Sequence, residues 1–184
     1  IGANHPSLLC ARLRRGVPLL FVQNITGFMV GKAYERGGIA KDGAKLVHAV
    51  ANAAVPKITV IIGGSFGAGN YGMCGRAYDS RFLFSWPNHQ IGIMGGEQAA
   101  KTLVEVKEKQ LKKQNEKIDS KVLAKVYSDT LEAYQHQMSA YYATSQLWDD
   151  GIIDPIDTRN ALGVSISASM NAPFINQGYG VFRL

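Results

Sequence analysis

The chain has 184 residues, of which 46% are hydrophobic and 18% charged, so it is long enough for one globular domain and too apolar to be disordered. Its net charge of +6 does not indicate a nucleic-acid partner, because the lysines between 101 and 125 are mixed with acidic residues at helical spacing, as on a solvated helix. No apolar run is long enough to span a membrane and nothing resembles a signal peptide; since the chain begins at Ile1, we expect a fragment of a longer protein.

The hydrophobic pattern predicts strands that alternate with helices. In chain order we expect a helix at 5–15, strands at 17–22 and 58–62 with a helix at 39–54 between them, a helix from 69 to 76, strands at 81–86 and 90–94, and helices at 97–117, 119–145 and 155–171. The run at 17–22 is all apolar and that at 58–62 is apolar or β-branched, without polar alternation, which is typical of strands covered on both faces. Such an order implies parallel β-α-β units, so the predicted fold class is α/β in a single domain.

Two other features allow more than one interpretation. Apolar and aromatic residues between 122 and 142 share one broad helix face, which favours a core or a subunit interface over a ligand site. Asp149, Asp150 and Asp154 could bind a metal ion, but acids beside Gly151 and Pro155 are more simply explained as turn and cap residues. We therefore expect no metal site.

A glycine-rich junction follows the second strand. Five glycines lie between 63 and 72, where the strand is expected to pass directly into a helix. At such a helix start several backbone N–H groups are unpaired and point outward, and they can bind an anion or a developing oxyanion. Gly27 follows the preceding strand, and we expect it at the same edge of the sheet.

Neither nucleotide motif that touches this junction is complete. Residues 67–72 match GxGxxG, but a dinucleotide site needs an acidic residue about 20 residues further on, where this chain has Pro87 and Asn88. The glycines also have P-loop spacing, but Asn70 and Tyr71 stand where Lys and Ser or Thr are required. The remaining hypothesis is oxyanion stabilisation by backbone donors, and the alternative is that the glycines only allow the helix to pack closely on the sheet.

Five stretches carry a resemblance to a known family. They are residues 23–31, 38–45, 56–78, 94–100 and 148–155. Together they resemble the acyl-CoA carboxyltransferase family, and within it the beta subunits of methylcrotonoyl-CoA carboxylase. The resemblance implies a ClpP/crotonase-like superfold with repeated β-β-α units. It also makes residues 1–184 the C-terminal domain of such a subunit, the half that receives biotin, without the N-domain that holds most of the CoA.

The resemblance implies a biotin-dependent ligase that moves a carboxyl group from carboxybiotin to 3-methylcrotonyl-CoA and forms 3-methylglutaconyl-CoA in leucine catabolism. Geranyl-CoA or propionyl-CoA as substrate, or a non-catalytic assembly module, are the alternatives. The implied partners are a biotin-containing alpha subunit, which alone would use ATP and Mg²⁺, and other beta subunits in a hexameric core. The implied location is the mitochondrial matrix in a eukaryote and the cytoplasm in a bacterium.

The same resemblance implies the site residues. By position, the backbone amides of Ala68 and Gly69 would be the oxyanion donors that hold the ureido oxygen of biotin while carbon dioxide leaves. Gly67 belongs to the same cofactor-binding segment, and Gly27 and Phe28 are expected to line the pocket. In this family biotin is thought to take the substrate proton, which agrees with the lack of an obvious side-chain base near the junction.

Overall fold

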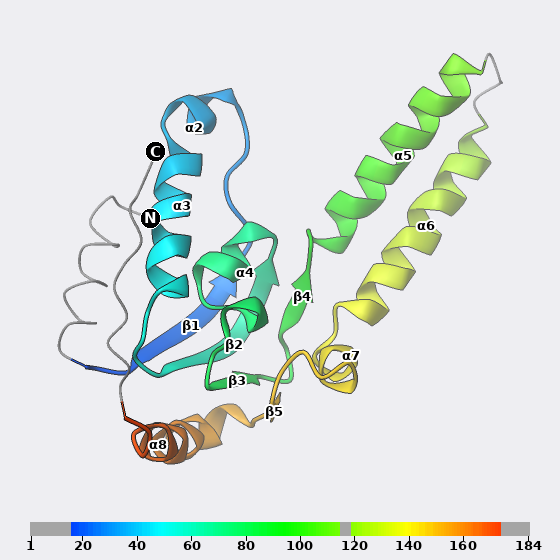
Figure 1. The fold of residues 1–184 in the computed structure, drawn as a ribbon. Coiled ribbons are helices and arrows are strands. Elements are labelled where there is room, and N and C mark those ends of the chain that lie inside the picture. Colours follow the sequence, from blue (N-terminus) through cyan, green and yellow to red (C-terminus); the bar gives the residue numbers. More distant parts are fainter. Residues whose placement is uncertain (1–15, 115–118, 174–184) are drawn as a thin grey trace.

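The computed structural model describes residues 16–114 and 119–173. The helix expected at 5–15 lies outside the described residues. The part that is described is an α/β structure built around one sheet, as predicted, with helices on both sides of it (Figure 1). None of the described helices is both long and apolar enough to cross a membrane.

The sheet has five strands, and every strand pair in it is parallel. The strands are β1 (Leu19–Ile25), β2 (Lys57–Phe66), β3 (Phe82–Ser85), β4 (Gln90–Gly92) and β5 (Gly151–Ile152). β1, β2, β3 and β5 lie in this order, and β4 pairs with the second half of β2. β2 is therefore the central strand, and its two halves serve different neighbours.

The sequence predicted the end of β2 incorrectly. The strand continues four residues beyond Ile62, because Gly64 to Phe66 pair with β4. The first two glycines of the junction are thus strand residues, and only Gly67 forms the turn. The prediction that β2 is covered on both faces is confirmed for its first half, where Lys57 to Ile61 are all buried.

The corresponding prediction for β1 is wrong. Phe21 and Gln23 are buried, but Leu20 and Val22 are each 47% exposed. β1 pairs only with β2, and in the described part of the chain nothing covers the face that carries Leu20 and Val22. An all-apolar strand pattern predicts that both faces of the strand are covered, but it does not predict that residues of the same chain cover them.

The helices are α2 (Lys32–Arg36), α3 (Ile39–Ala51), α4 (Ala68–Gly72), α5 (Gly96–Lys113), α6 (Ser120–Gln137), α7 (Ala140–Ser145) and α8 (Thr158–Ser169), with short 3-10 turns at Arg76–Tyr78 and Pro155–Asp157. α3 packs Leu46 and Val50 against Phe21 of β1 and Cys74, and these four side chains form a buried cluster. α5 and α6 pack on each other and extend away from the sheet as a hairpin (Figure 1).

The single helix expected at 119–145 is two helices. α6 ends at Gln137, and Ser139 starts α7 by accepting a hydrogen bond at its Oγ from the N–H of Tyr142 at 3.2 Å. α6 contains no buried residue. Its apolar face is therefore not part of the core of this chain, and a subunit interface remains a prediction.

Candidate functional site

The glycine-rich junction lies where two neighbouring strands end. β1 ends at Ile25 and β2 at Phe66, and α4 begins directly afterwards at Ala68. Because β1 and β2 are parallel, their ends meet at one edge of the sheet, and this is the edge at which α/β proteins bind ligands. The structure thus brings the turn at residues 67–69 and the loop that contains Gly27 to the same place, as the sequence predicted.

Gly67 makes the turn from strand to helix. Its φ of 58° and ψ of −146° lie in a region that residues with a Cβ rarely adopt. Its N–H donates to the carbonyl oxygen of Gly92 at the end of β4, over 3.0 Å. The turn is therefore fixed to a neighbouring strand, and this N–H is not available to a ligand.

The next two N–H groups are available. Ala68 and Gly69 are the first residues of α4, where helical geometry leaves N–H groups without an intrahelical acceptor. Among the described residues neither N–H has another hydrogen-bond partner, whereas the N–H of Asn70 donates to the Gly67 carbonyl oxygen at 3.2 Å. The junction therefore presents two adjacent unpaired donors, an arrangement that can stabilise a negatively charged oxygen.

A cavity of about 320 Å³ lies beside these donors, between α4 and the loop that leaves β1. Its walls are mostly apolar and include Ile25, Gly27, Phe28 and Gly69. Three of the five residues predicted to contact the cofactor therefore line one cavity. The other two, Gly67 and Ala68, adjoin Gly69 in the chain but do not line it.

Gly69 allows α4 to approach the end of β1 closely. A Cβ at this position would collide with Cγ2 of Ile25 and would lie 3.6 Å from the Cα of Gly27. Close helix-to-sheet packing, the alternative to a binding role, is thus a real function of Gly69. It does not account for the two unpaired N–H groups, so the two interpretations are compatible.

Phe28 closes the other end of the cavity. Its ring lies between α3 and α4, because a Cβ on Gly43 would be 2.9 Å from Cε2 of the ring and a Cβ on Gly72 would be 3.7 Å from Cζ. The side chain is partly buried. Phe28 is therefore a wall residue that anchors the loop carrying Gly27.

A buried polar network beneath α4 was not predicted. Asn70 donates from Nδ2 to Oγ of Ser65 at 2.7 Å, and Ser65 donates to Oε1 of Gln23 at 2.6 Å. Gln23 in turn donates from Nε2 to the carbonyl oxygen of Met73 at 2.8 Å. Gln23 and Ser65 are both 0% exposed. The only signal in the sequence is a polar residue at the end of each apolar strand.

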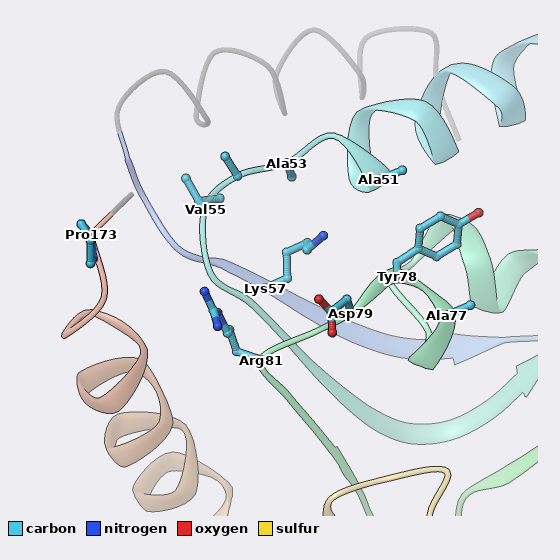
Figure 2. A pocket seen from close by; sticks show the side chains of 10 residues that line it. Ala51, Ala53, Val55, Lys57, Ala77, Tyr78, Asp79, Arg81 and Pro173 are labelled. Atoms are coloured by element: carbon cyan, nitrogen blue, oxygen red, sulfur yellow. The ribbon is translucent and has the colours of Figure 1, made fainter. Parts of the chain in front are cut away.

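Another cavity, of about 610 Å³, lies elsewhere (Figure 2). It is at the opposite edge of the sheet, where β2 begins, and its charged lining residues are Lys57, Asp79 and Arg81. Lys57 is buried and donates from Nζ to the Val50 carbonyl oxygen at 3.2 Å. Because this cavity is far along β2 from α4, the predicted donors do not face it.

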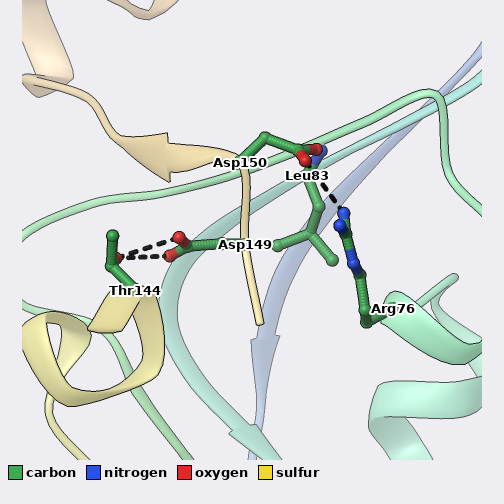
Figure 3. Close-up of polar contacts among 5 residues, drawn as sticks. All are labelled: Arg76, Leu83, Thr144, Asp149 and Asp150. Carbon is green, nitrogen blue, oxygen red and sulfur yellow. Dashed lines mark hydrogen bonds and ion pairs between the residues drawn. The ribbon is translucent and has the colours of Figure 1, made fainter. Parts of the chain in front are cut away.

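The acidic residues after α7 serve the fold (Figure 3). Asp149 accepts from Oγ of Ser85 at 2.6 Å, and Asp150 accepts from the N–H of Leu83 at 2.7 Å and pairs with Arg76 at 2.9 Å. In the same stretch Asp154 caps the 3-10 turn that follows it. The interpretation as turn and cap residues is thus confirmed for Asp154, and the other two also bind β3. In the described ranges no group of three or more His, Cys, Asp or Glu side chains is arranged to hold a metal ion.

No titratable side chain is among the residues that line the cavity beside α4. Burial raises the pKa of the Cys74 thiol, which follows α4 and is 0% exposed, so this cysteine is a core residue and not a nucleophile. Burial lowers the pKa of His89, on the turn before β4. The site can therefore position a ligand and stabilise charge through its backbone, but it offers no side-chain acid or base.

The comparisons with known proteins agree on one family. The model of the carboxyl transferase domain matches residues 6–179 of the chain. The biotin-dependent 3-methylcrotonyl-coenzyme A carboxylase beta1 subunit of Mycobacterium tuberculosis is 54% identical over 93% of this chain and 32% of its own length. The mitochondrial methylcrotonoyl-CoA carboxylase beta chain of Dictyostelium discoideum is 53% identical over 93% of this chain and 29% of its own length.

Solved structures lead to the same fold. The beta subunit of Pseudomonas aeruginosa geranyl-CoA carboxylase superposes with a TM-score of 0.82 at 45% identity, over 99% of this chain and 35% of that one. The transcarboxylase 12S subunit, whose structure is described as a hexamer, has a TM-score of 0.81 at 25% identity, over 98% of this chain and 33% of that one. These neighbours support the predicted fold class, and the parallel α/β sheet is consistent with a crotonase-like fold. The chain spans about a third of the length of the relatives that it matches.

Proposed function

The chain belongs to the carboxyl transferase domain family, and on this basis we propose that it is the biotin-side, C-terminal domain of the carboxyltransferase subunit of a biotin-dependent acyl-CoA carboxylase. The substrate that we propose is 3-methylcrotonyl-CoA and the product 3-methylglutaconyl-CoA, as the names of the relatives at 53% and 54% identity suggest. The observation that carries the proposal is the pair of unpaired N–H groups of Ala68 and Gly69 beside an apolar cavity.

These residues fit biotin. Its ureido oxygen would accept hydrogen bonds from the N–H groups of Ala68 and Gly69, and Gly69 lines the cavity. When bound, biotin supplies the carboxyl group that the enzyme transfers. Gly27 and Phe28 would form the facing wall and exclude water, which strengthens electrostatic interactions at the donors.

The contribution of this chain would be electrostatic. One well-placed donor to a developing oxyanion is worth about 3–4 kcal/mol of transition-state stabilisation, so two could supply most of a moderate rate enhancement. No titratable side chain lines the cavity. The chain would thus orient the cofactor and stabilise negative charge, and it would leave proton transfer to other groups.

The proposal includes partners. Biotin would come from an alpha subunit, which would also hold the ATP- and Mg²⁺-dependent biotin carboxylase, and other beta subunits would supply the N-domain side of the site. A hexameric beta core is proposed by analogy with the hexamer described for transcarboxylase 12S. The exposed apolar face of β1 is a surface that such an assembly could cover, and α6 has no buried residue. The location would be the mitochondrial matrix in a eukaryote, as the names of eukaryotic relatives suggest, or the bacterial cytoplasm.

Another acyl-CoA is the second candidate. The geranyl-CoA carboxylase beta subunit is 45% identical, and a Bacillus subtilis relative named as a putative propionyl-CoA carboxylase beta chain is 35% identical. Both values are lower than those of the relatives named as methylcrotonyl-CoA carboxylases, which favours 3-methylcrotonyl-CoA. A non-catalytic assembly module would need neither unpaired donor.

The test uses the full-length subunit assembled with its biotin-containing partner. ATP-dependent incorporation of labelled bicarbonate is measured with 3-methylcrotonyl-CoA, geranyl-CoA and propionyl-CoA, each with and without avidin. We expect the highest kcat/KM with 3-methylcrotonyl-CoA and complete inhibition by avidin. Incorporation of bicarbonate that avidin does not affect would refute the biotin dependence. A higher kcat/KM with geranyl-CoA or propionyl-CoA would show that this acyl-CoA, and not 3-methylcrotonyl-CoA, is the substrate. No incorporation with any of the three would favour the non-catalytic module.

A further inference from the structure

We propose that Asn70, Ser65 and Gln23 are positioning residues, which hold α4 in the orientation that aims the N–H groups of Ala68 and Gly69 at the ligand. The inference rests on the proposed function of these two donors, and it assigns a role to three side chains that are not among the proposed biotin-binding residues.

α4 cannot define its own orientation. It has only five residues, little more than one helical turn, and helices of this length are unstable without tertiary contacts. Its first residue is exposed, and its close contacts are made by glycines, Gly69 against Ile25 of β1 and Gly72 against Leu46 of α3. Residues without side chains fix the distance between helix and sheet well, but they resist rotation of the helix about its axis poorly.

The network holds α4 at its third residue and at its C-terminal end. Asn70 is the residue after Gly69, and its side chain is bonded to Ser65 of β2. At the C-terminal end the Met73 carbonyl oxygen, at the C-cap of α4, is bonded to Gln23 of β1. Because Ser65 and Gln23 are also bonded to each other at 2.6 Å, the two attachments form one unit that crosses the strand pair. Rotation of the first turn would break the Asn70 bond, so the directions of the two N–H groups that precede it are fixed.

Each hydrogen bond has only one possible direction. The Ser65 hydroxyl donates its proton to Oε1 of Gln23, so it must accept from Nδ2 of Asn70. If the Gln23 amide were turned around, its oxygen would face the Met73 carbonyl oxygen, and two acceptors would meet without a proton. The two buried members are 0% exposed, so water cannot replace a lost partner. A same-size replacement of an amide by a carboxylate should therefore disturb the network without changing the packing.

The loop after α4 leaves space for this arrangement. A Cβ on Gly75 would overlap the side-chain oxygen of Asn70, and the N–H of Gly75 donates to the Asn70 carbonyl oxygen at 2.8 Å. Asn70 is thus enclosed by Ser65 on one side and by Gly75 on the other. A residue with only a helix-forming role would not need contacts on both sides.

The test compares three variants of the full-length, biotin-loaded holoenzyme. Ser65→Ala removes the centre of the network, and Asn70→Asp keeps the size of the side chain but removes its N–H donor. Ser85→Ala is the matched control, because Ser85 is also 0% exposed and also donates a 2.6 Å hydrogen bond, to Asp149, but on β3 away from α4. The melting temperature, kcat and the KM for the acyl-CoA are measured for each.

We expect Ser65→Ala and Asn70→Asp to lower kcat by about tenfold to a hundredfold, the range that small misplacements of catalytic groups produce, with the KM for the acyl-CoA unchanged. Ser85→Ala should keep the wild-type kcat even where its melting temperature falls as far as that of Ser65→Ala. A purely structural network would instead lower activity in proportion to stability in all three variants.

Wild-type kcat in folded Ser65→Ala and Asn70→Asp would overturn the inference, and so would an equal loss of kcat in Ser85→Ala. If Ser65→Ala does not assemble, the same-size Asn70→Asp decides; failure of both to assemble would show that the network is needed for folding and not for aiming. Avidin-sensitive carboxylation by the wild-type enzyme is measured first, so failure of the proposed function is recognised separately.

Discussion

The replacement of Gly69 by Ala tests how closely α4 must approach β1. The added Cβ would collide with Cγ2 of Ile25, a methyl group on a β-branched side chain that is stiff at χ1, and would lie 3.6 Å from the Cα of Gly27. The φ of Gly69 is not positive, so backbone strain plays no part and only packing is tested. Overpacking of this kind costs about 1–3 kcal/mol, and the usual gain of Gly→Ala in a helix returns about 0.5–1 kcal/mol.

We therefore expect a net loss of about 1–2 kcal/mol for Gly69→Ala, seen as a lower melting temperature of the assembled full-length subunit. The rate of carboxyl transfer should fall by about tenfold or more, a larger loss than the decrease in folded enzyme alone would cause. The reason is that α4 must move to make room for the methyl group, and its N–H groups move with it. Gly163→Ala is the control. Gly163 lies in α8, is exposed, and a Cβ there would meet nothing within 4 Å.

A double-mutant cycle identifies the cause. If the collision with Ile25 is responsible, Ile25→Ala in the same chain should recover part of the stability lost in Gly69→Ala, and the two free-energy changes should be less than additive by about 0.5–3 kcal/mol, the usual range for residues in contact. If Gly69→Ala behaves like Gly163→Ala in both stability and transfer rate, the close approach of α4 to β1 is not required and the reasoning is wrong.

Two further predictions concern parts of the fold away from α4. Asp150→Ala should cost about 1–3 kcal/mol, because it leaves the N–H of Leu83 without its acceptor, whereas Arg76→Ala should cost at most about 1 kcal/mol, because the ion pair is partly exposed; equal losses in denaturation experiments would contradict this. Burial lowers the pKa of His89 below its ordinary 6.5, so protonation of the ring is less favourable in the folded protein than in the unfolded chain. The stability that this difference contributes is present above pH 6.5 and is lost as the pH falls from 6.5 through the lowered pKa. The melting temperature should therefore fall on acidification below pH 6.5, and less so in His89→Gln; an identical pH dependence in the variant would exclude His89 as the cause.

The elements that the sequence predicted best are those whose signal is local. The apolar run at 58–62 and the helical periodicity from Ile39 correspond to β2 and α3. The end of β2 was missed, because Gly63 and Gly64 resemble a loop in the sequence, whereas residues 64–66 pair with β4 and Ser65 also pairs with β1. The break before α7 had a local signal, the cap residue Ser139, which the continuous aromatic pattern concealed.

The parts of the candidate site that could be predicted from the sequence also had a local signal or a resemblance to known proteins. The turn at residues 67–69 is continuous in the chain, and the resemblance to carboxyltransferases pointed to Gly27 and Phe28, which the structure brings to the same cavity as Gly69. The bond between Gln23 and Ser65 joins residues on two strands, 42 positions apart. No local pattern encodes such a contact, since it depends on the register of β1 against β2.

The most direct test of the central claim removes one backbone donor and nothing else. Ala68 is the first residue of α4, a position that accepts proline well, and it is exposed, so the ring has space. Gly67 before it has a φ of 58° and a ψ of −146°, outside the α region that a following proline disfavours. Ala68→Pro should therefore delete the N–H without disturbing the helix, and Ala68→Ser, which keeps the N–H, is the control.

The measurement is the kcat of avidin-sensitive carboxyl transfer to 3-methylcrotonyl-CoA by the assembled holoenzyme. If the Ala68 N–H stabilises the developing oxyanion, Ala68→Pro should lower kcat by about a hundredfold to a thousandfold, while assembly and the KM for the acyl-CoA stay at the wild-type values and Ala68→Ser remains active. Wild-type kcat in a correctly assembled Ala68→Pro enzyme would contradict the assignment of the donor at the start of α4.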